Sequence, residues 1–536
     1  MSVVPAPRER LLARVVPVTL PRIAAGLFGL VVVSIALRSR AIHGRFWIDE
    51  GISTGIASHP FAHIPGLLRE DGSPPLYYLL LHVWMRVVGS GEAETHALSL
   101  GFALLTIPTA FVLGRELFGT RAAWGSAALS ATNPFLTYYA QETRMYALVV
   151  WLSMLVAGSF ALAFVRRRRR WVPVFALSQA ALLYAHNWGF FIAIGTVAAL
   201  GLCLRLADDR RALMRDAALG YGGVALLFVA WIPTLLFQAA HTGAPWSTRP
   251  GINGLVSGLV VISGGATTAL ALALVGGAGL AALAAGWNGV GPAGPKGREA
   301  ARDAAVLAAV LAVALVAAWV ASQVSPAWSN RYFAVFVGPL LLLAGGALTS
   351  AGRLGAITLI VVALFWLHPR THELNNKSDV HRVSVLVHDS LVPGDLIIST
   401  HPEQVPVLHY YLPDPGLRWA TSMGPVRDPA VMDWRDALDR LKDARPKATL
   451  SRLLRDVKPD TTVVLMQPIL RTARWGAPWT KLVKKRSLQW EKAMNSNPRL
   501  VRIGQLPHLA HQRLPRGVRA VFYRVRGRAA PARGSP

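Results

Sequence analysis

Long apolar stretches follow one another through the first two thirds of the chain, separated by short polar segments. A helix needs about 20 mainly apolar residues to cross a hydrocarbon layer about 30 Å thick, and several stretches reach that length. The chain is therefore predicted to be a polytopic helical membrane protein. Spans are expected at residues 21–37, 96–117, 121–138, 144–165, 171–185, 188–206, 216–239, 256–286, 303–321, 331–350 and 354–368.

One further apolar stretch, residues 76–88, is short for a full crossing and follows two prolines. It is compatible with a steep short helix or with a helix lying at the membrane interface. If it does not span, the chain has eleven crossings, and thirteen also satisfy the pattern. An odd number is needed because the N-terminus is expected inside and the polar tail outside.

The distribution of basic residues sets this orientation. The net charge of +28 would suit nucleic-acid binding, but many arginines sit in short loops between apolar stretches, as at residues 166–170 and 210–211. That distribution is typical of cytoplasmic loops, so we expect no nucleic acid partner. The N-terminal segment 1–20, also basic, is predicted to be cytoplasmic and to precede a retained first helix, because no small-residue cleavage site follows it.

The composition changes at about residue 370. Residues 370–536 are polar and proline-rich, and they follow a predicted transmembrane domain at residues 21–369. Short runs with β-character alternate with helical patterns, which predicts a C-terminal α/β domain on the outer face. The predicted strands are residues 395–399, 462–467, 500–504 and 520–525, and the predicted helices are residues 433–444 and 479–494. The single cysteine, Cys203, excludes an intramolecular disulfide.

Three loops on the predicted outer side carry the candidate chemistry. The first loop, residues 38–75, contains two adjacent acids, and acids near a bilayer are costly unless water, a metal or a cation receives them. Together the loops would place three carboxylates opposite at least two arginines. A sugar-phosphate donor needs such a set, with a base for the acceptor hydroxyl and cations for the departing phosphate. The residues concerned are Asp49, Glu50, Gln141, Glu142, Arg144, Arg331 and Tyr332.

Each of these residues also has a purely structural interpretation. Asp49 and Glu50 would serve equally as loop acids facing water. Glu142 and Arg144 would serve as an ion pair or a helix cap. Arg331 would serve as an interfacial anchor, because arginine snorkels at helix ends.

Histidines in two loops leave similar alternatives open. His186, between two spans, fits a metal or phosphate contact, but a polar residue in a tight turn is the commoner outcome. His59 and His63 are four residues apart, as in a metal-binding pair, and the pattern is weak without a third ligand.

The order of motifs resembles that of a known family. Phe-Trp-x-Asp-Glu at residues 46–50 is followed by Pro-Pro-Leu-Tyr-Tyr at 74–78, Tyr-Tyr-x-Gln-Glu-x-Arg-x-Tyr-Ala-Leu at 138–148 and Arg-Tyr-Phe at 331–333. This order resembles the GT-C fold glycosyltransferases that use polyprenyl-phosphate sugars, of the kind represented by protein mannosyltransferases and the aminoarabinose transferase of lipid A (glycosyltransferase family 39-like). The resemblance covers about residues 20–370 well and the tail only loosely.

The resemblance implies roles for the loop residues. Asp49 would be the catalytic base or acceptor-positioning acid, with Glu50 beside it, and Arg144 and Arg331 would bind the donor phosphate. Four further residues would position the substrate or a metal: Gln141, Glu142, His186 and Tyr332. Relatives often carry His or Asn before Pro-Pro, and this chain departs from that pattern with Gly72-Ser73. The need for a divalent cation stays open, and no metal ligands are assigned.

The sequence thus favours an inverting membrane glycosyltransferase on the outer face of a bacterial plasma membrane. Its donor would be mannose or a similar sugar on polyprenyl phosphate, and its acceptor a glycan, lipid or protein. The alternative is a transporter or flippase for a lipid-linked sugar, which predicts acids within spans and transporter-type internal repeats. Neither feature is evident in the sequence. An assembly scaffold is less favoured because it leaves the loop acids without a role.

Overall fold

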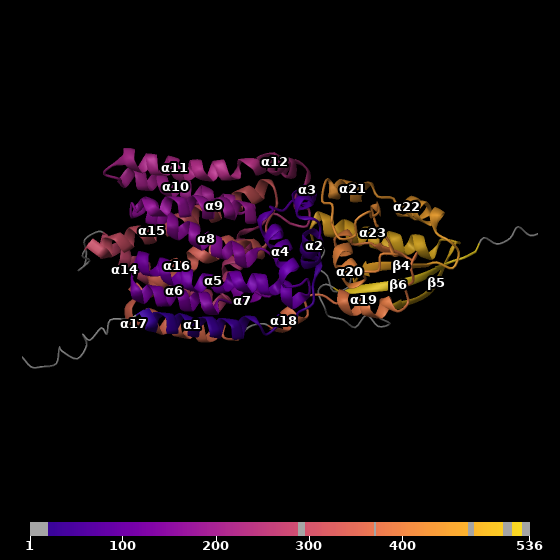
Figure 1. The fold of residues 1–536 in the computed structure, drawn as a ribbon, viewed down its shortest axis with the longest axis horizontal. Coiled ribbons are helices and arrows are strands. Elements are labelled where there is room, and N and C mark those ends of the chain that lie inside the picture. The colour runs from indigo at the N-terminus through magenta and orange to yellow at the C-terminus, as the bar shows by residue number, and fades with distance from the viewer. Residues whose placement is uncertain (1–19, 288–294, 369–370, 470–475, 507–516, 528–536) are drawn as a thin grey trace, which may run out of the picture.

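A computed structural model describes residues 20–287, 295–368, 371–469, 476–506 and 517–527. A helical bundle occupies one end of the elongated molecule and a smaller α/β region the other (Figure 1). Residues 1–19 of the predicted cytoplasmic segment lie outside the described residues, as does the expected domain boundary at 369–370.

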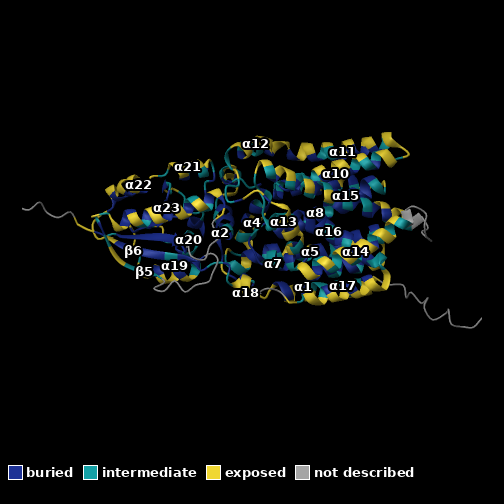
Figure 2. Ribbon diagram, turned by 180° about the vertical axis from the view of Figure 1, so that it is seen from behind, coloured by how far each residue is buried: buried dark blue, intermediate teal, exposed yellow. Residues whose placement is uncertain are grey.

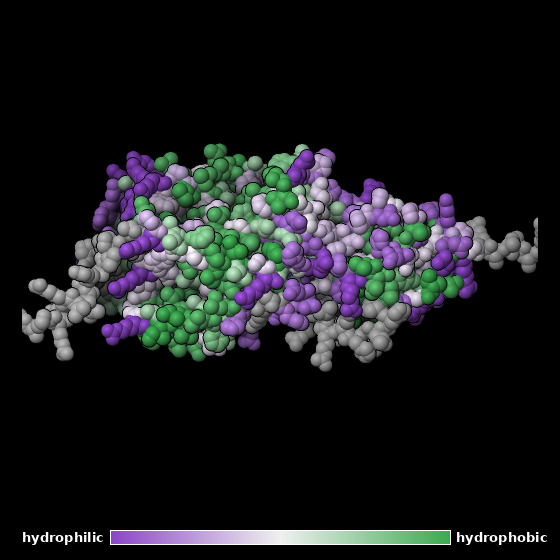
Figure 3. Space-filling view, turned by 60° about the horizontal axis from the view of Figure 1, so that its bottom comes forward, coloured by the Kyte–Doolittle hydropathy of each residue, from purple (hydrophilic) through white to green (hydrophobic). Residues whose placement is uncertain are grey.

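The helices of the bundle follow the apolar stretches of the sequence. They are α1 (Leu20–Arg38), α5 (Glu92–Phe118), α6 (Thr120–Thr132), α7 (Pro134–Tyr139), α8 (Tyr146–Phe160), α9 (Val172–Ala185), α10 (Gly189–Leu206), α11 (Arg210–Phe228), α12 (Ile232–His241), α13 (Ile252–Ile262), α14 (Ala266–Trp287), α15 (Pro295–Val324), α16 (Ala334–Ser350) and α17 (Gly352–Trp366). Helices α8 and α16 are buried at the centre, whereas α1, α11 and α17 expose apolar side chains on the outside (Figures 2 and 3).

Within the described residues, eight helical segments are long and apolar enough to cross a membrane. Three other predicted spans form shorter helices that pack in the same bundle: α6 with α7, α9, and α17. The structure thus supports eight crossings among the described residues, and the number of eleven to thirteen stays a prediction. The predicted span at 256–286 is instead divided into α13 and α14, because Gly264 and Gly265 adopt positive φ angles of 79° and 134° that end the first helix.

The stretch after the two prolines forms α4 (Leu76–Val87), a helix of 12 residues. At 1.5 Å per residue it is about 18 Å long, too short for the hydrocarbon layer. It packs against α2 (Ile48–Ala57) and lies with α3 (Ile64–Asp71) at the end of the bundle that faces the α/β region (Figure 1).

The basic loops gather at the opposite end of the bundle. Arg166 forms ion pairs with Glu299 and Asp303, so the loop after α8 is tied to the start of α15. Arg167 and Arg169 of the same loop both pair with Asp216 of α11, and Arg168 pairs with Glu116 of α5. The bundle therefore has one arginine-rich end and one end that carries the candidate site.

The C-terminal region is a mixed sheet with helices on both faces. The strand order is β3-β2-β1-β4-β6-β5, with β1 parallel to β2 and to β4 and the other pairs antiparallel. The strands are β1 (Leu396–Ser399), β2 (Arg418–Thr421), β3 (Gly424–Pro425), β4 (Thr462–Pro468), β5 (Leu500–Leu506) and β6 (Val518–Val525). The helices are α18 (Thr371–Asn375), α19 (Val380–His388), α20 (Val405–Tyr411), α21 (Ala437–Asp443), α22 (Pro446–Leu453) and α23 (Pro478–Asn495).

Alternation along the strands creates two cores. Ile397 and Val464 pack with α19 and α20, whereas their neighbours Ile398 and Leu465 pack with α22 and α23 on the other face. All four strands predicted from the sequence are present, and the helix predicted at 479–494 is α23. The strands β2 and β3 were not predicted, because four and two residues are too few to show an alternating pattern.

Helix α2 lies at the junction between the bundle and the α/β region. It has two glycines on the packed face, and a Cβ added to Gly51 would come within 2.5 Å of the Cα of Val407 in α20. Gly55 lies in similar contact with the carbonyl of Ala430. Side chains at these positions would push the two parts of the molecule away from each other.

An ion pair strengthens this junction. His59 Nε2 lies 2.8 Å from Asp428 Oδ2, and His59 Nδ1 lies 2.9 Å from the carbonyl oxygen of Gly55. The bond to Asp428 is the main cause that raises the pKa of His59, and the same bond lowers the pKa of Asp428.

The pair predicts a pH-dependent contribution to stability. Since the folded pKa of His59 is raised, its contribution is complete below the unperturbed value of about 6.5 and is lost as the pH rises through the folded pKa. We expect His59→Gln to lower the melting temperature most near pH 5–6 and least above about pH 8. Thermal unfolding monitored by tryptophan fluorescence measures this. His63→Gln, at an exposed position in the same loop, is the control. If His59→Gln lowered the melting temperature equally at pH 5–6 and above about pH 8, the prediction would be contradicted.

Candidate active site

The acid of the first loop and the late arginine meet directly. Asp49 is in the first turn of α2, and its Oδ2 accepts a hydrogen bond from Arg331 Nη1 at 2.6 Å. Arg331 lies in a short 3₁₀ helix, η5 (Asn330–Phe333), that leads into α16. The side chains of Asp49 and Arg331 keep 16% and 19% of their surface exposed, so a ligand is able to reach the pair.

The second arginine holds the same turn from another side. Arg144 Nη1 donates to the carbonyl oxygen of Asp49 at 3.3 Å, to Ser53 Oγ at 3.0 Å and to Tyr78 Oη at 3.3 Å. It lies in the loop between α7 and α8, so the three predicted outer loops converge on α2. The Nε atoms of Arg144 and Arg331 are both buried without a hydrogen-bond partner. Two unsatisfied guanidinium nitrogens beside one carboxylate form a site suited to an anion.

Glu50 points away from this pair into the protein. Successive helical residues differ by about 100° in direction, so adjacent acids face different surroundings. Glu50 is fully buried and accepts hydrogen bonds from His96 Nε2 at 2.6 Å, Lys377 Nζ at 2.7 Å and the backbone N–H of Thr143 at 2.9 Å. Burial alone would raise the pKa of Glu50, but Lys377 and His96 lower it to about 2. Glu50 therefore stays ionised and serves to hold α2.

The sequence did not single out His96 or Lys377. His96 lies near the start of α5, and Lys377 follows the last helix of the bundle, 327 residues from Glu50. Neither belongs to a motif, so only the fold reveals this buried network.

Loss of the lysine is expected to destabilise the protein. Lys377→Met would leave Glu50 buried without its cation, which costs about 3–5 kcal/mol when one partner of a buried pair is removed. The double variant Glu50→Gln with Lys377→Met should recover part of that loss. Lys442→Met removes an exposed pair and is the control. Chemical unfolding of the purified protein gives the free energy of unfolding of each variant. An equal loss in Lys377→Met and Lys442→Met would contradict the prediction.

Gln141 and Glu142 are buried in the loop that precedes α8. Gln141 Oε1 accepts from the backbone N–H of Ala41 at 2.7 Å, and its carbonyl oxygen accepts from Lys377. Gln141 thus joins the end of α1 to the Glu50 network. Both polar atoms of the Gln141 side chain are hydrogen-bonded within the protein, and these bonds fix the conformation of the loops.

His186 and Tyr332 stand on the Arg331 side of the site. Their ring centroids are 5.0 Å apart, and the ring of Tyr146 lies 6.0 Å from that of His186. Arg331 lies over the rings of Trp47 and Tyr332, at 5.5 and 5.6 Å from their centroids. The arginine is therefore surrounded by aromatic groups that orient its guanidinium.

A third acid, Asp71, lies near Arg144 and Asp49, and no role was predicted for it from the sequence. Asp71 ends α3, is buried, and is hydrogen-bonded to the hydroxyl and backbone of Ser73. Burial is the main cause that raises its pKa to about 6, with Arg144 opposing and Asp49 adding to the shift. The sequence signal was the Asp-Gly-Ser-Pro-Pro run at 71–75, where Ser73 stands at the position that departs from the family pattern.

The histidine pair of the first loop does not form a metal site. Both ring nitrogens of His59 are occupied, by Gly55 and Asp428, and His63 is exposed. Among the residues that the structure describes, no three His, Cys, Asp or Glu side chains are grouped so as to hold a metal ion.

The architecture of this chain is also found in proteins of known structure. No family model and no curated protein matches this sequence. Solved structures do match. ArnT from Cupriavidus metallidurans bound to undecaprenyl phosphate aligns with a TM-score of 0.59 and 14% identity, over 95% of this chain and 99% of that one.

Two further structures align at similar levels. An oligosaccharyltransferase from Archaeoglobus fulgidus gives a TM-score of 0.53 with 12% identity, over 82% of this chain and 69% of that one. The mycobacterial arabinofuranosyltransferase AftD gives 0.52 with 14% identity, over 95% of this chain and 40% of AftD.

These matches define the class of the fold. The chain has the GT-C fold: a multi-pass bundle of membrane helices followed by a C-terminal α/β region. The fold predicted from the order of motifs is confirmed.

Proposed function

We propose that this protein is a membrane glycosyltransferase that moves a sugar from a polyprenyl-phosphate donor to an acceptor hydroxyl. The observation that carries the proposal is the ion pair of Asp49 with Arg331, together with the hydrogen bonds that Arg144 donates to the same turn of α2. A partly exposed carboxylate and two neighbouring arginines would supply the base and the phosphate site that the reaction needs. The match to ArnT, whose structure holds undecaprenyl phosphate, supports a lipid-borne donor.

The reaction follows from these contacts. The donor phosphate competes with Asp49 for Arg331, and its binding releases the Asp49 carboxylate from the ion pair. Asp49 then accepts the proton of the acceptor hydroxyl while that oxygen bonds to the anomeric carbon. The bond from the anomeric carbon to the phosphate oxygen breaks, and its electron pair leaves with the polyprenyl phosphate. The new charge on the phosphate is stabilised by the arginines, and attack opposite the leaving group inverts the anomeric centre.

The arrangement of charge supports activity on the outer face of a bacterial plasma membrane. The arginine-rich end of the bundle is the expected cytoplasmic end, and the candidate site lies at the other. A lipid-linked donor suits that location because nucleotide sugars are absent outside. The transferred sugar would be mannose or a similar sugar, and the C-terminal region would lie outside the cell.

A transfer assay tests the proposal against the flippase alternative. Purified protein in lipid nanodiscs is given undecaprenyl phosphate carrying radiolabelled mannose or arabinose, with mannose- and arabinose-containing oligosaccharides and a serine-rich peptide as acceptors. The proposal expects labelled acceptor and an equal amount of free undecaprenyl phosphate. In vesicles, movement of intact donor between leaflets without its cleavage would overturn the proposal in favour of a flippase.

A further inference from the structure

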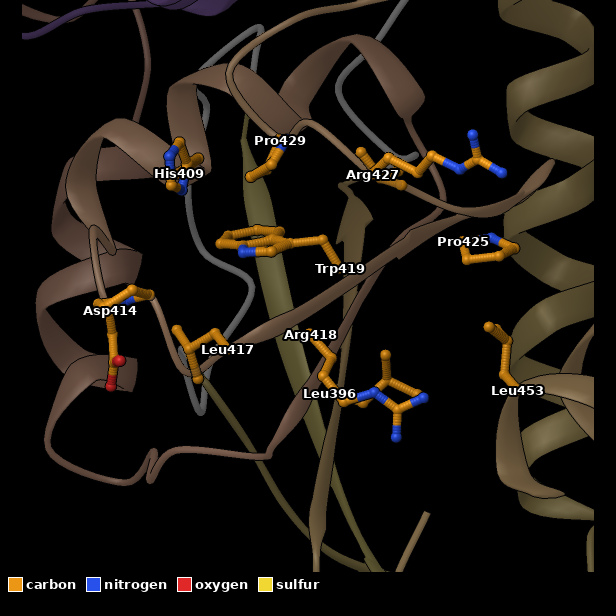
Figure 4. A pocket seen from close by; sticks show the side chains of 12 residues that line it. Leu396, His409, Asp414, Leu417, Arg418, Trp419, Pro425, Arg427, Pro429 and Leu453 are labelled. Atoms are coloured by element: carbon orange, nitrogen blue, oxygen red, sulfur yellow. The ribbon is translucent and has the colours of Figure 1, made fainter. Parts of the chain in front are cut away.

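A cavity of about 430 Å³ opens at the edge of the sheet in the C-terminal region, where β2 and β3 lie (Figure 4). Its size is within the range of sites for small molecules. Trp419 of β2 lies at its centre, and His409 of α20 meets the tryptophan ring edge-on at 5.7 Å between centroids. The walls are mixed in character, with prolines and aliphatic side chains as well as charged ones.

The polar groups of this cavity carry both charge signs. Arg418 and Arg427 lie to one side of Trp419, whereas Asp414 lies on the other (Figure 4). The Nδ1 atom of His409 is buried without a hydrogen-bond partner. An unsatisfied ring nitrogen in a cavity is expected to meet a polar group of a ligand.

This lining suits a sugar better than other ligand classes. A sugar ring offers an apolar C–H face to aromatic and proline surfaces, and its hydroxyls both donate and accept hydrogen bonds. A peptide that extends the sheet would need an open strand edge, but the edge strand β3 has two residues and one is Pro425. A purely anionic ligand would not favour the carboxylate of Asp414.

The cavity is physically joined to helix α2. One wall is α20, which packs on Gly51, and another is the segment containing Arg427, whose neighbour Asp428 pairs with His59 just beyond α2. From Asp49 to His59 the chain advances ten residues, or about 15 Å at helical rise. A ligand that reaches both Asp49 and the cavity must therefore be extended.

We propose that this cavity is a distal acceptor subsite that binds a sugar unit of a glycan chain whose reacting end lies at Asp49. The inference rests on the proposed function and deepens it, because it names an extended glycan as the acceptor. It assigns Trp419, His409 and Arg427 to acceptor binding and gives them no part in bond making.

The test compares acceptors of different length. Wild-type protein, Trp419→Ala and Arg427→Ala are assayed with six-unit mannose and arabinose oligosaccharides and with the matching methyl glycosides. We expect a rise of about tenfold in KM for the six-unit acceptor, as for loss of one binding hot spot, with kcat unchanged. Rates with the methyl glycoside should not change. Arg524→Ala, on the exposed side of β6, is the control.

Three results would overturn the inference: equal KM changes for long and short acceptors, no change for either variant, or competition by a serine-rich peptide but not by free oligosaccharide. Arg427 is exposed, so its variant remains informative if Trp419→Ala fails to fold. Absence of transfer by wild-type protein to every acceptor would instead contradict the proposed function itself.

Discussion

Replacing Asp49 by asparagine is expected to abolish sugar transfer while the protein remains folded. Asparagine keeps the shape of the side chain and still reaches Arg331, but it cannot take the proton of the acceptor hydroxyl. Removal of a general base slows a reaction by about 10²- to 10⁴-fold. Initial rates of transfer from radiolabelled donor measure the effect, and the donor KM should fall or stay unchanged, because the donor phosphate no longer competes with a carboxylate for Arg331.

Glu70→Gln is the matched control for this experiment. Glu70 is an acid of the same outer loop that pairs with Arg435 on the C-terminal region, and it has no contact with the Asp49–Arg331 pair. Its variant should transfer sugar at close to the wild-type rate. Transfer by Asp49→Asn at more than about a tenth of the wild-type rate would show that another group is the base.

Arg331→Gln is expected to impair both donor binding and catalysis. The variant loses the charge that receives the phosphate and leaves Asp49 without its partner, so kcat/KM should fall by about 10³-fold. Lysine at this position should restore only part of the activity, because an ammonium lacks the planar fork that contacts two phosphate oxygens. Free undecaprenyl phosphate should also inhibit the Arg331→Gln variant more weakly than the wild type.

Arg249→Gln serves as the control, since Arg249 is an exposed arginine of another loop at the same end of the bundle. Unchanged inhibition by undecaprenyl phosphate in Arg331→Gln would mean that the phosphate binds elsewhere. The two experiments measure different quantities, because one follows the rate of transfer and the other the inhibition by undecaprenyl phosphate.

Apolar stretch length and strand alternation predicted most of the architecture. They predicted the bundle, its short α4 and four of the six strands because these depend on local patterns. The convergence of the loops at Asp49, Arg144 and Arg331 also followed from sequence, since loops on one side of a bundle lie close together. The break within 256–286 was not predicted, although Gly264 and Gly265, whose positive φ angles end a helix, are a turn signal in the sequence.

The surroundings of individual acids were not predictable in this way. The interpretation of Glu50 as a loop acid facing water is wrong, because Glu50 is fully buried against His96 and Lys377, which lie 46 and 327 residues away. Asp71 became notable only when α3 brought it beside Arg144. Long-range burial distinguishes adjacent carboxylates, and a sequence pattern contains no information on which of them faces the interior.

The ion pair of Lys377 and Glu50 has a consequence for folding during synthesis, because it forms only after residue 377 has been made. A chain is synthesised from its N-terminus, so α2 and its acids emerge long before residue 377. Until that lysine arrives, Glu50 lacks its lysine partner, and α2 lacks one of the contacts that hold it in the bundle. A chain that ends before residue 377 would thus contain Asp49, Arg144 and Arg331 on an incompletely anchored helix, and we expect such a chain to lack the transfer activity proposed for the full protein.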